Sequence, residues 1–412
     1  MAILLYRLAL GLLSPLALVV LLLEGRKRQG GWRFLRERCG FQSKPSQHCD
    51  IWFHAASVGE ANAIFPLLRL AVECGRVLVT TNTPEAARLV AQRLGDQVSH
   101  CYCPLDFAWA TRRLIANFQP KHLFIAETEL WPNLFHVCEQ RDLPVVIING
   151  RLSHKTRDAH PFVKRYYRAA LQTVSAVWAR SQDDAEGFIE LGCAKDRIKV
   201  LGNIKFAGVV PSKLPSKETY LPERQFVLAA STHADEEIQL ATIWQKMENA
   251  PLLVIVPRHP PRGPGIADQL RNRGHVVSLR SAGEVVDDAT QIYVADTLGE
   301  LNLFAQRALW VFMGGSLVPI GGHNMLEPAS LGKAVVSGWH LNNFREESDY
   351  LLARQALWVA KDVEQLAQMF TVLLADHEQR TLLEKRAAAA MQEAASVLTA
   401  YETEFAGTFG GG

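Results

Sequence analysis

Residues 312–328 read FMGGSLVPIGGHNMLEP. The stretch continues an apolar run, 308–312, and leads into a helical pattern that carries Glu327. Between them lie two glycine pairs, Gly314-Gly315 and Gly321-Gly322. Glycines let a backbone turn sharply and approach a ligand closely, and the start of a helix presents unpaired N–H groups that suit a phosphate. We expect a strand, a turn and a helix that together hold a nucleotide sugar. A purely structural turn before a capped helix is the alternative.

The same order of apolar run and helical pattern recurs along both halves of the chain. In the first half we expect strands at 51–55, 76–80, 97–101, 122–126, 145–149 and 176–179, and in the second half at 226–230, 252–256, 275–278, 291–294, 308–312 and 334–337. Alternation of this kind predicts α/β architecture, with parallel sheets covered by helices on both faces. Two doubly wound, Rossmann-like domains would face a cleft at the carboxyl ends of their strands, where such folds bind ligands.

The chain length of 412 residues fits two domains. Prolines and polar residues at 208–223 are typical of a linker. We therefore expect an N-terminal anchor at 1–25, a first domain at 26–207, the linker at 208–223, and a second domain with C-terminal helices at 224–412.

Composition narrows the class of protein. Hydrophobic residues make up 48% of the chain, which favours a folded protein, and the net charge of +2 argues against a nucleic-acid partner. The seven cysteines have irregular spacing, as is usual in a reducing compartment. No Walker A pattern occurs, so ATP hydrolysis is not expected.

The N-terminal segment indicates contact with a membrane. Residues 3–23 carry one charge, Arg7, and as a helix they would be about as long as a bilayer core is thick. The basic stretch that follows, 26–28, predicts that the bulk of the protein stays in the cytoplasm. Arg7 would snorkel to the interface in a spanning helix. A helix that lies on the membrane surface, kinked at Pro15, is the alternative.

In the first domain, carboxylates follow the ends of two predicted strands. Glu60 lies where the strand at 51–55 turns into a helix, and it is a candidate general base. Glu127 and Glu129 follow the strand at 122–126, where a carboxylate can stabilise a developing cation or orient an acceptor. For these acids the alternative is a favourable charge in the first turn of a helix.

A lysine and several polar turns complete the candidate set. Lys205, just before the linker, can contribute a point charge to the site, although most lysines are solvated surface residues. In the second domain Arg258 is suited to phosphate, and polar turns at 231–233 and 296–301 follow strand ends. No Asp-x-Asp motif stands at a strand end, so we expect metal-independent chemistry without a cofactor.

The chain resembles a known family across nearly its full length. The motifs that carry the resemblance are SVGE (57–60), ETELWPN (127–133), NGRLS (149–153), GNIKF (202–206), STH (231–233), PRHP (257–260), DTLGEL (296–301) and GGSLVPIGGHN (314–324). They look like those of the 3-deoxy-D-manno-octulosonic acid (Kdo) transferases of Gram-negative bacteria. The resemblance implies a GT-B glycosyltransferase at the inner membrane, with its catalytic domains on the cytoplasmic side. Such enzymes transfer Kdo from CMP-Kdo to a lipid A precursor and invert the anomeric centre.

The resemblance also assigns roles to matching positions. Glu60 would be the catalytic base, and Glu127 and Lys205 would stabilise the transition state. CMP would be bound by Pro257, Arg258, Leu298, Gly299, Glu300, Asn324, Met325, Leu326 and Glu327.

Two alternatives stay open from the sequence. One is another GT-B transferase that uses a UDP-sugar and a lipid-linked acceptor. The other is a membrane-associated binding protein that has kept the fold and lost catalysis.

Overall fold

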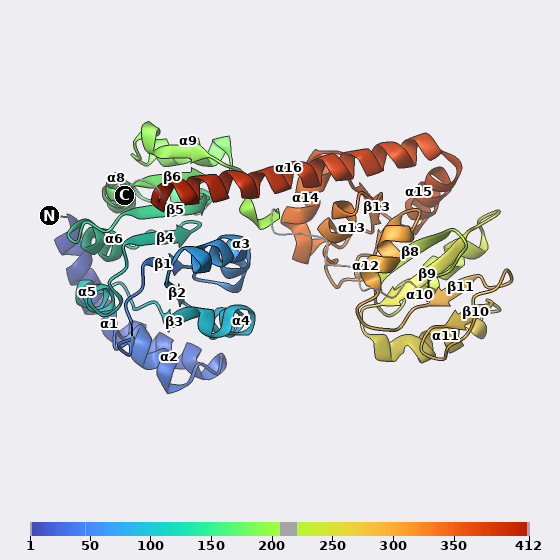
Figure 1. Ribbon diagram of the computed structural model, residues 1–412, viewed down its shortest axis with the longest axis horizontal. Helices are drawn as coiled ribbons and strands as arrows, with labels where there is room; N and C mark the ends of the chain where they lie inside the picture. The colour runs from blue at the N-terminus through green and yellow to red at the C-terminus, as the bar shows by residue number, and fades with distance from the viewer. Residues whose placement is uncertain (1, 46, 207–220, 410–412) are drawn as a thin grey trace. The chain divides into compact units, whose positions relative to one another are not determined.

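The computed structural model describes residues 2–45, 47–206 and 221–409 (Figure 1). Two compact units emerge, one made of Met1–Gly208 with Ser396–Gly412 and the other of Val209–Ala395. Residues 208–220 of the predicted linker lie outside the described residues. We describe each unit by itself.

A seven-stranded sheet forms the centre of unit 1, with the strand order β3-β2-β1-β4-β5-β6-β7. Its strands are β1 (Ile51–His54), β2 (Val77–Thr81), β3 (Val98–Tyr102), β4 (His122–Ala126), β5 (Val145–Gly150), β6 (Ala176–Ala179) and β7 (Ile198–Val200). The described pairs are parallel. Chain order reverses between β1 and β4, the place where ligands bind in doubly wound sheets.

Helices pack on both faces of this sheet, because the strands are apolar on both sides. Their bounds are α1 (Ala2–Lys27), α2 (Gly31–Arg38), α3 (Val58–Cys74), α4 (Pro84–Leu94), α5 (Ala108–Phe118), α6 (Pro132–Glu139), α7 (His154–Arg157), α8 (Pro161–Thr173) and α9 (Gln182–Glu190). In β1, Ile51 and Phe53 join one core cluster with α3 and α4, whereas Trp52 joins the opposite cluster with α5, α6 and α8. Alternation of side chains along the strand therefore builds two cores.

The end of the last helix, α16 (His377–Phe409), belongs to unit 1. Tyr401 and Phe405 are fully buried against the same core cluster as Phe53. The Tyr401 hydroxyl accepts a hydrogen bond from Asn149 N at 3.2 Å. This differs from the sequence expectation, which placed all of 224–412 in the second domain. Apolar residues at the end of a long helix do not reveal which core will bury them.

Unit 2 repeats the architecture with the strand order β10-β11-β9-β8-β12-β13-β14. Its strands are β8 (Phe226–Thr232), β9 (Leu252–Pro257), β10 (Val277–Leu279), β11 (Ile292–Val294), β12 (Val311–Met313), β13 (Val335–Ser337) and β14 (Trp358–Val359). Its helices are α10 (Glu236–Gln245), α11 (Gly263–Arg271), α12 (Leu301–Arg307), α13 (Leu326–Ser330), α14 (Arg345–Ala353), α15 (Val363–Ala375) and the first part of α16. The described strand pairs are again parallel, and chain order reverses between β8 and β12.

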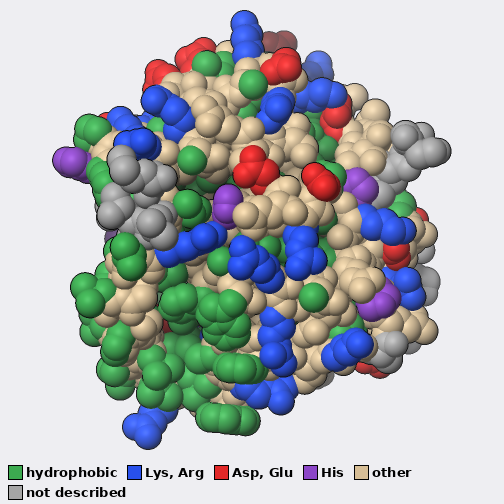
Figure 2. Space-filling model, turned by 90° about the vertical axis from the view of Figure 1, so that its left-hand side faces the viewer, with side chains coloured by type: hydrophobic (Ala, Val, Ile, Leu, Met, Phe, Trp, Pro, Cys, Tyr) green, Lys and Arg blue, Asp and Glu red, His purple; other side chains and the backbone are tan. Residues whose placement is uncertain are grey.

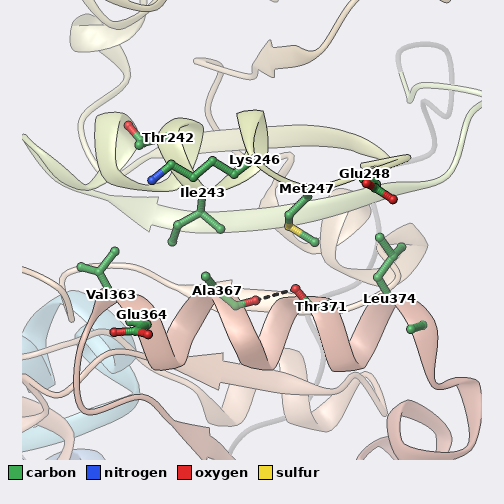
Figure 3. Close-up of a pocket in the computed structure, with 11 residues that line it drawn as sticks. Thr242, Ile243, Lys246, Met247, Glu248, Val363, Glu364, Ala367, Thr371 and Leu374 are labelled. Atoms are coloured by element: carbon green, nitrogen blue, oxygen red, sulfur yellow. Dashed lines mark hydrogen bonds between the residues drawn. The ribbon is translucent and has the colours of Figure 1, made fainter.

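A groove of about 800 Å³ lies between α10 and α15 (Figure 3). Ile243, Met247, Val363 and Leu374 give it apolar walls, and the carbonyl of Ala367 accepts a hydrogen bond from the hydroxyl of Thr371. None of the site residues predicted from the sequence lines this groove. The candidate chemistry of unit 2 lies instead in the turns that follow its strands.

Candidate active site

In unit 1 the candidate residues follow the two strands that flank the reversal of chain order. Glu60 lies in the first turn of α3, which begins after β1, and Glu127 directly follows the last residue of β4. Because β1 and β4 are adjacent and parallel, their carboxyl ends share one edge of the sheet. The two acids therefore lie at the place where this fold binds its ligands.

Glu60 is held by the turn that starts α3. Its carboxylate accepts hydrogen bonds from Ala56 N and from the Ser57 hydroxyl, both at 2.8 Å. Ser57 in turn caps the helix by accepting from Glu60 N at 3.3 Å. The spacing Ser-x-x-Glu gives a variant of the capping box, in which the Glu60 carboxylate accepts from the backbone N–H of the residue before the cap. The local sequence thus fixes where the carboxylate of Glu60 lies.

The surroundings of Glu60 adjust its acidity. Burial raises its pKa to about 7; hydrogen bonds from Ser57 and Ala56 oppose the shift, and the charges of Glu129 and Glu127 reinforce it. Near neutral pH this carboxyl exchanges between its protonated and ionised forms. A group with a pKa close to the working pH is effective at taking up a proton.

Glu127 and Lys205 form an ion pair within unit 1. Lys205 Nζ lies 2.9 Å from Glu127 Oε1, and the two side chains are 23% and 19% exposed. Glu127 adopts a left-handed backbone conformation with φ of 58°. A positive φ in a residue other than glycine costs about 1 kcal/mol or more and persists where the surrounding structure enforces it. The fold holds Glu127 in this conformation and brings Lys205 to it.

Asn149, at the end of β5, supports the segment that carries Lys205. Its side-chain oxygen accepts a hydrogen bond from Ile204 N at 3.2 Å, and its own φ is 54°. Because Ile204 precedes Lys205, this contact fixes the backbone from which the lysine side chain extends. The NGRLS motif therefore acts on the site through Asn149.

Glu129 and Arg38 add two charges at the same edge. Glu129 accepts a hydrogen bond from Trp131 Nε1 at 2.7 Å, and burial raises its pKa. Arg38 donates to Asn82 Oδ1 at 2.6 Å and to Cys103 O at 2.5 Å, which places it at the carboxyl ends of β2 and β3. Burial lowers the pKa of Arg38. Arg38 is not among the residues predicted from the sequence, because a single arginine in a basic segment carries no local signal.

In unit 2 the glycine-rich turn binds a carboxylate of the protein itself. Glu236, fully buried, accepts hydrogen bonds from the backbone N–H groups of Gly315, Ser316 and Leu317 at 2.7–2.9 Å. It also accepts from His233 N at 2.9 Å. The N–H groups of 315–317 are therefore already bonded to Glu236, although the sequence predicts that the glycine-rich run holds a nucleotide sugar. Glu236 is not among the residues predicted from the sequence.

Gly314 has a structural reason for being glycine. A Cβ atom at this position would lie 2.7 Å from Ser231 O and 2.8 Å from Thr232 Cα. These are backbone atoms that cannot move aside cheaply. Gly314 therefore lets the end of β12 pack against the end of β8.

Two histidines meet above this turn. His233 Nε2 and His323 Nε2 lie 2.8 Å apart, and their rings are nearly parallel. Burial, together with the neighbouring His233 and Arg258, lowers the pKa of His323 to about 4. The pKa of His233 is also lowered by burial, then by His259. At neutral pH both rings are uncharged, so one Nε2 donates a hydrogen bond and the other accepts it.

Two arginines, Arg258 and Arg262, follow β9. The side chain of Arg262 forms an ion pair within unit 2, whereas that of Arg258 is exposed. Arg262 pairs with the buried Glu237 through contacts of 3.0 and 3.2 Å. Arg258 is exposed, and its backbone N–H donates to Thr232 O at 3.0 Å. Pro257 is the buried last residue of β9. Arg258 is thus the arginine that is placed to contact a ligand from this strand end.

The residues 298–300 follow β11, the neighbour of β9. Leu298 is 85% exposed, and Gly299 has a φ of 85° with open space where a side chain would be. Glu300 receives two hydrogen bonds from Arg280, at 2.8 and 3.2 Å, and these lower its pKa. The turn therefore presents backbone and apolar groups, with an ionised Glu300 behind them.

The segment 324–327 follows β12. The Asn324 amide donates to Glu327 Oε1 at 3.1 Å, and its oxygen accepts from Leu326 N at 3.2 Å. Met325 and Leu326 are buried, whereas Glu327 is exposed. The helix is shorter than expected from the sequence, because α13 spans only Leu326–Ser330. Asn324 accepts a hydrogen bond from the N–H of Leu326 at the start of this helix.

Metal ligands do not gather among the residues that the structure describes. Within 2–45, 47–206 and 221–409, no group of three or more His, Cys, Asp or Glu side chains is arranged to hold an ion.

Comparison with known proteins assigns the family. A family model described as 3-deoxy-D-manno-octulosonic-acid transferase matches residues 33–208. The 3-deoxy-D-manno-octulosonic acid transferase of Haemophilus influenzae is 35% identical over 365 residues, which cover 85% of each chain. The chain belongs to the Kdo transferase family. The family expected from the sequence motifs is confirmed, and with it the enzyme class, a glycosyltransferase of lipopolysaccharide biosynthesis.

Solved structures place this Kdo transferase in its fold class. UDP-GlcNAc 2-epimerase from Neisseria meningitidis matches 85% of this chain and 99% of its own, with a TM-score of 0.50 and 14% identity, which concerns the fold alone. The C-terminal CMP-Kdo binding domain of WaaA from Acinetobacter baumannii is 34% identical, covering 41% of this chain and 90% of that one, with a TM-score of 0.39. The expected fold class, with two parallel-sheet α/β domains of GT-B type, is confirmed.

Proposed function

We propose that this Kdo transferase moves Kdo from CMP-Kdo to a hydroxyl group of a lipid A precursor, with inversion at the anomeric carbon. The observation that carries the proposal is Glu60, a carboxyl group with a pKa near 7 beside the Glu127–Lys205 pair. Because the chain belongs to the Kdo transferase family, Kdo is the sugar that we propose it transfers. The nucleotide and the acceptor are those that the motif resemblance implies.

In this mechanism Glu60 is the base. The acceptor oxygen forms a bond to the anomeric carbon of Kdo while the bond from that carbon to the CMP phosphate oxygen breaks. The proton of the acceptor hydroxyl passes to the carboxylate of Glu60, and CMP leaves with the bonding electrons. Attack from the face opposite CMP inverts the anomeric centre. Only the ionised form of Glu60 can perform this step, and its raised pKa makes that form a stronger base.

Glu127 and Lys205 stabilise charges that develop in the transition state; neither transfers a proton. We assign Lys205 to stabilising the negative charge that the transferred acid sugar and the leaving group bring to the site. Glu127 keeps the lysine in position through the 2.9 Å contact and favours cationic character at the anomeric carbon. Because Glu127 lies on a strained backbone next to β4, its carboxylate is already oriented before substrate arrives.

The CMP part of the donor is assigned to unit 2. The proposed contacts are those at Pro257 and Arg258, at Leu298 to Glu300, and at Asn324 to Glu327. Their three turns follow β9, β11 and β12, strands of one parallel sheet, at its carboxyl edge. Arg258 is suited to bind the phosphate through paired N–H groups. Its exposed side chain supports this role, since the neighbouring Arg262 is taken up by Glu237.

We place the enzyme at the inner membrane, with both units on the cytoplasmic side. The apolar helix α1 and the basic residues that follow it support this location. A lipid-linked acceptor requires such a location, because the enzyme must meet its substrate in the bilayer.

Transfer to a defined acceptor tests the function. Purified full-length protein is incubated with CMP-Kdo and a tetraacylated lipid A precursor, and the product mass counts the Kdo units added. We expect Glu60→Gln to reduce the rate by about 10²–10⁴-fold. The matched control is Glu73→Gln, at an exposed position of the same helix, which should transfer normally. Unchanged transfer by Glu60→Gln would remove this residue as the base.

Nucleotide binding tests the donor separately. We expect CMP to bind and UDP to bind far more weakly, measured by calorimetry with the wild-type protein. Tight binding of UDP without CMP would assign the enzyme to UDP-sugars. Binding of CMP without any turnover would indicate a protein that has lost catalysis.

A further inference from the structure

Helix α1 presents one continuous stripe of residues to unit 1. The partly or fully buried residues on α1 share one helical face: Ile3, Tyr6, Arg7, Leu10, Ser14, Ala17, Leu21 and Gly25. Residues about three or four positions apart lie on the same side of a helix. The stripe runs nearly from end to end of α1. The helix therefore lies lengthwise against unit 1.

The first turns of α1 are attached by polar contacts. The Tyr6 hydroxyl donates to Asp106 Oδ2 at 2.9 Å, and Arg7 Nε donates to Asn133 Oδ1 at 2.7 Å. Asp106 also caps α6, because its carboxylate accepts from Asn133 N and Leu134 N at 2.9 and 2.8 Å. Arg7 thus contacts unit 1, whereas in a spanning helix it is expected to snorkel to the membrane interface.

The last turns of α1 are attached by apolar contacts. Leu21 is buried in a cluster with Phe34 of α2 and Tyr102 of β3. Gly25 lets α2 approach closely, since a Cβ atom there would lie 3.1 Å from the Leu35 side chain. Both ends of the helix are therefore bound to the same folded unit.

These two attachments conflict with a helix that crosses the bilayer. From Tyr6 to Leu21 an α-helix rises about 22 Å at 1.5 Å per residue. If α1 stood across a hydrocarbon core about 30 Å thick, Asp106 and Asn133 would have to enter it together with the helix. Placing such polar groups in hydrocarbon costs several kcal/mol each.

The opposite face of α1 has the character of a surface that contacts lipid. Its exposed leucine and valine side chains are Leu8, Leu12, Leu13, Leu16, Leu18, Val19, Val20, Leu22 and Leu23. Leu12 is 84% exposed, and Trp32 at the start of α2 is 76% exposed. Figure 2 shows one surface of unit 1, on which hydrophobic side chains gather in one region and a band of Lys and Arg side chains lies beside them. Exposed cations near the end of α1 and on α2 include Arg26, Lys27 and Arg36.

We propose that α1 lies in the plane of the membrane and buries its leucine-rich face in one leaflet without crossing the bilayer. The inference rests on the membrane attachment proposed above and defines its geometry. α1 is apolar around most of its circumference, and its contacts with unit 1, not a polar face of its own, hold it in this orientation. A helix in this position sinks about 5–10 Å into the boundary between headgroups and acyl chains, and adjacent cations bind anionic lipid headgroups. The partner is therefore the bilayer surface itself.

This geometry links the lipid surface to the candidate base. Helix α2, packed on the end of α1, carries Arg38, which contacts Asn82. The backbone N–H of Asn82 donates to Ala56 O at 3.1 Å, and Ala56 N donates to the carboxylate of Glu60. A short series of contacts thus fixes the carboxyl edge of the sheet relative to the membrane helix.

Depth measurements along α1 test the proposal. Single cysteines replace Leu8, Leu12, Leu16 and Leu23 in full-length protein in which Cys39 and Cys74 are serine, and each carries a nitroxide label. The proteins are reconstituted in vesicles of phosphatidylethanolamine and phosphatidylglycerol, and collisions with oxygen and a nickel chelate report depth. A label on α16 at Leu382 serves as the control for exposure to water.

We expect the four α1 labels to lie at one shallow depth. A pattern that is deepest at Leu12 and Leu16 and returns to the surface at Leu8 and Leu23 would show a spanning helix and overturn the proposal. Four labels that remain as accessible to the nickel chelate as Leu382 would overturn it as well, because the face would then contact no lipid.

The sidedness of the N-terminus gives a second test. An epitope tag before Met1 should be cut by protease in inverted inner-membrane vesicles and protected in intact spheroplasts. The reverse pattern would place the N-terminus across the membrane and overturn the proposal. Kdo transfer measured on the same proteins reports on the proposed function alone, since depth and sidedness do not depend on turnover.

Discussion

Lys205 Nζ lies 2.9 Å from Glu127 Oε1, so the fold pairs a residue that follows the edge strand β7 with a residue that directly follows the central strand β4. The pair is balanced in charge and partly screened from water. It also sits beside Glu60, whose acidity responds to the charge of Glu127. A substitution of Lys205 should therefore change the pKa of Glu60.

Replacing Lys205 by methionine removes the cation and leaves Glu127 unbalanced. We expect transfer to fall by about 10²-fold, as for other electrostatic groups in active sites. The pH midpoint of the remaining activity should rise, because the uncompensated negative charge disfavours ionisation of Glu60. The measurement is the pH profile of kcat/KM.

Lys199 offers a matched control for this change. It pairs with Glu404 at 2.7 Å on the surface of the same unit, and exposed pairs contribute little. Lys199→Met should transfer at the wild-type rate. Equal losses in the two variants would show that Lys205 has no special role in the reaction.

Because folding raises the pKa of Glu60, we expect the free energy of unfolding to decrease as pH rises. The folded protein binds this proton up to a pKa of about 7, whereas a glutamate in the unfolded chain releases it near 4.5. Stability therefore falls as pH rises between these values, since the folded state holds more protons there. Glutamine does not titrate, so the Tm of Glu60→Gln relative to wild type should increase from pH 5 to pH 8.

Thermal unfolding of both proteins across this pH range measures the effect. The control is again Glu73→Gln, for which the difference in Tm from wild type should stay constant. A constant difference for Glu60→Gln would mean that Glu60 ionises normally in the folded protein.

Glu129→Gln should move the pH profile of transfer to lower pH. The charge of Glu129 raises the pKa of Glu60, so its removal eases ionisation of the base. Trp131→Phe is the comparison, because it removes the 2.7 Å hydrogen bond to Glu129 and keeps the charge. A midpoint that shifts equally in both variants would point to a change in packing instead of charge.

Glu236→Gln should destabilise unit 2. The carboxylate accepts four backbone hydrogen bonds, and an amide offers only one acceptor oxygen, so buried N–H groups lose their partners. We expect a loss of about 2–4 kcal/mol in the free energy of unfolding. Urea unfolding measures it, with Glu248→Gln, exposed after the same helix, as the neutral control.

Gly314→Ala should disturb the ends of β8 and β12. The added Cβ atom would lie within 3 Å of Ser231 O and Thr232 Cα, so one strand end has to shift. We expect weaker CMP binding together with a lower Tm. Gly265→Ala in helix α11 has open space and should be neutral or slightly stabilising. Wild-type CMP affinity in Gly314→Ala would show that the turn does not depend on this close approach.

Local sequence patterns were sufficient to predict the architecture and part of the site. Strands and helices follow from the spacing of apolar residues, which is a property of neighbours in the chain. The position of Glu60 follows similarly from the Ser-x-x-Glu box. The positions of the turns after β9, β11 and β12 could also be predicted, because each turn directly follows its strand.

Only the tertiary structure shows which of these groups meet. Glu236 takes the N–H groups of a turn far along the chain, Lys205 reaches Glu127, and Tyr401 joins the first unit instead of the second. The apolar segment at the N-terminus was consistent with two topologies, and the contacts of Tyr6 and Leu21 favour one of them. The physical reason is that the local pattern fixes backbone geometry, whereas partners, burial and pKa values depend on atoms that folding brings from distant parts of the sequence.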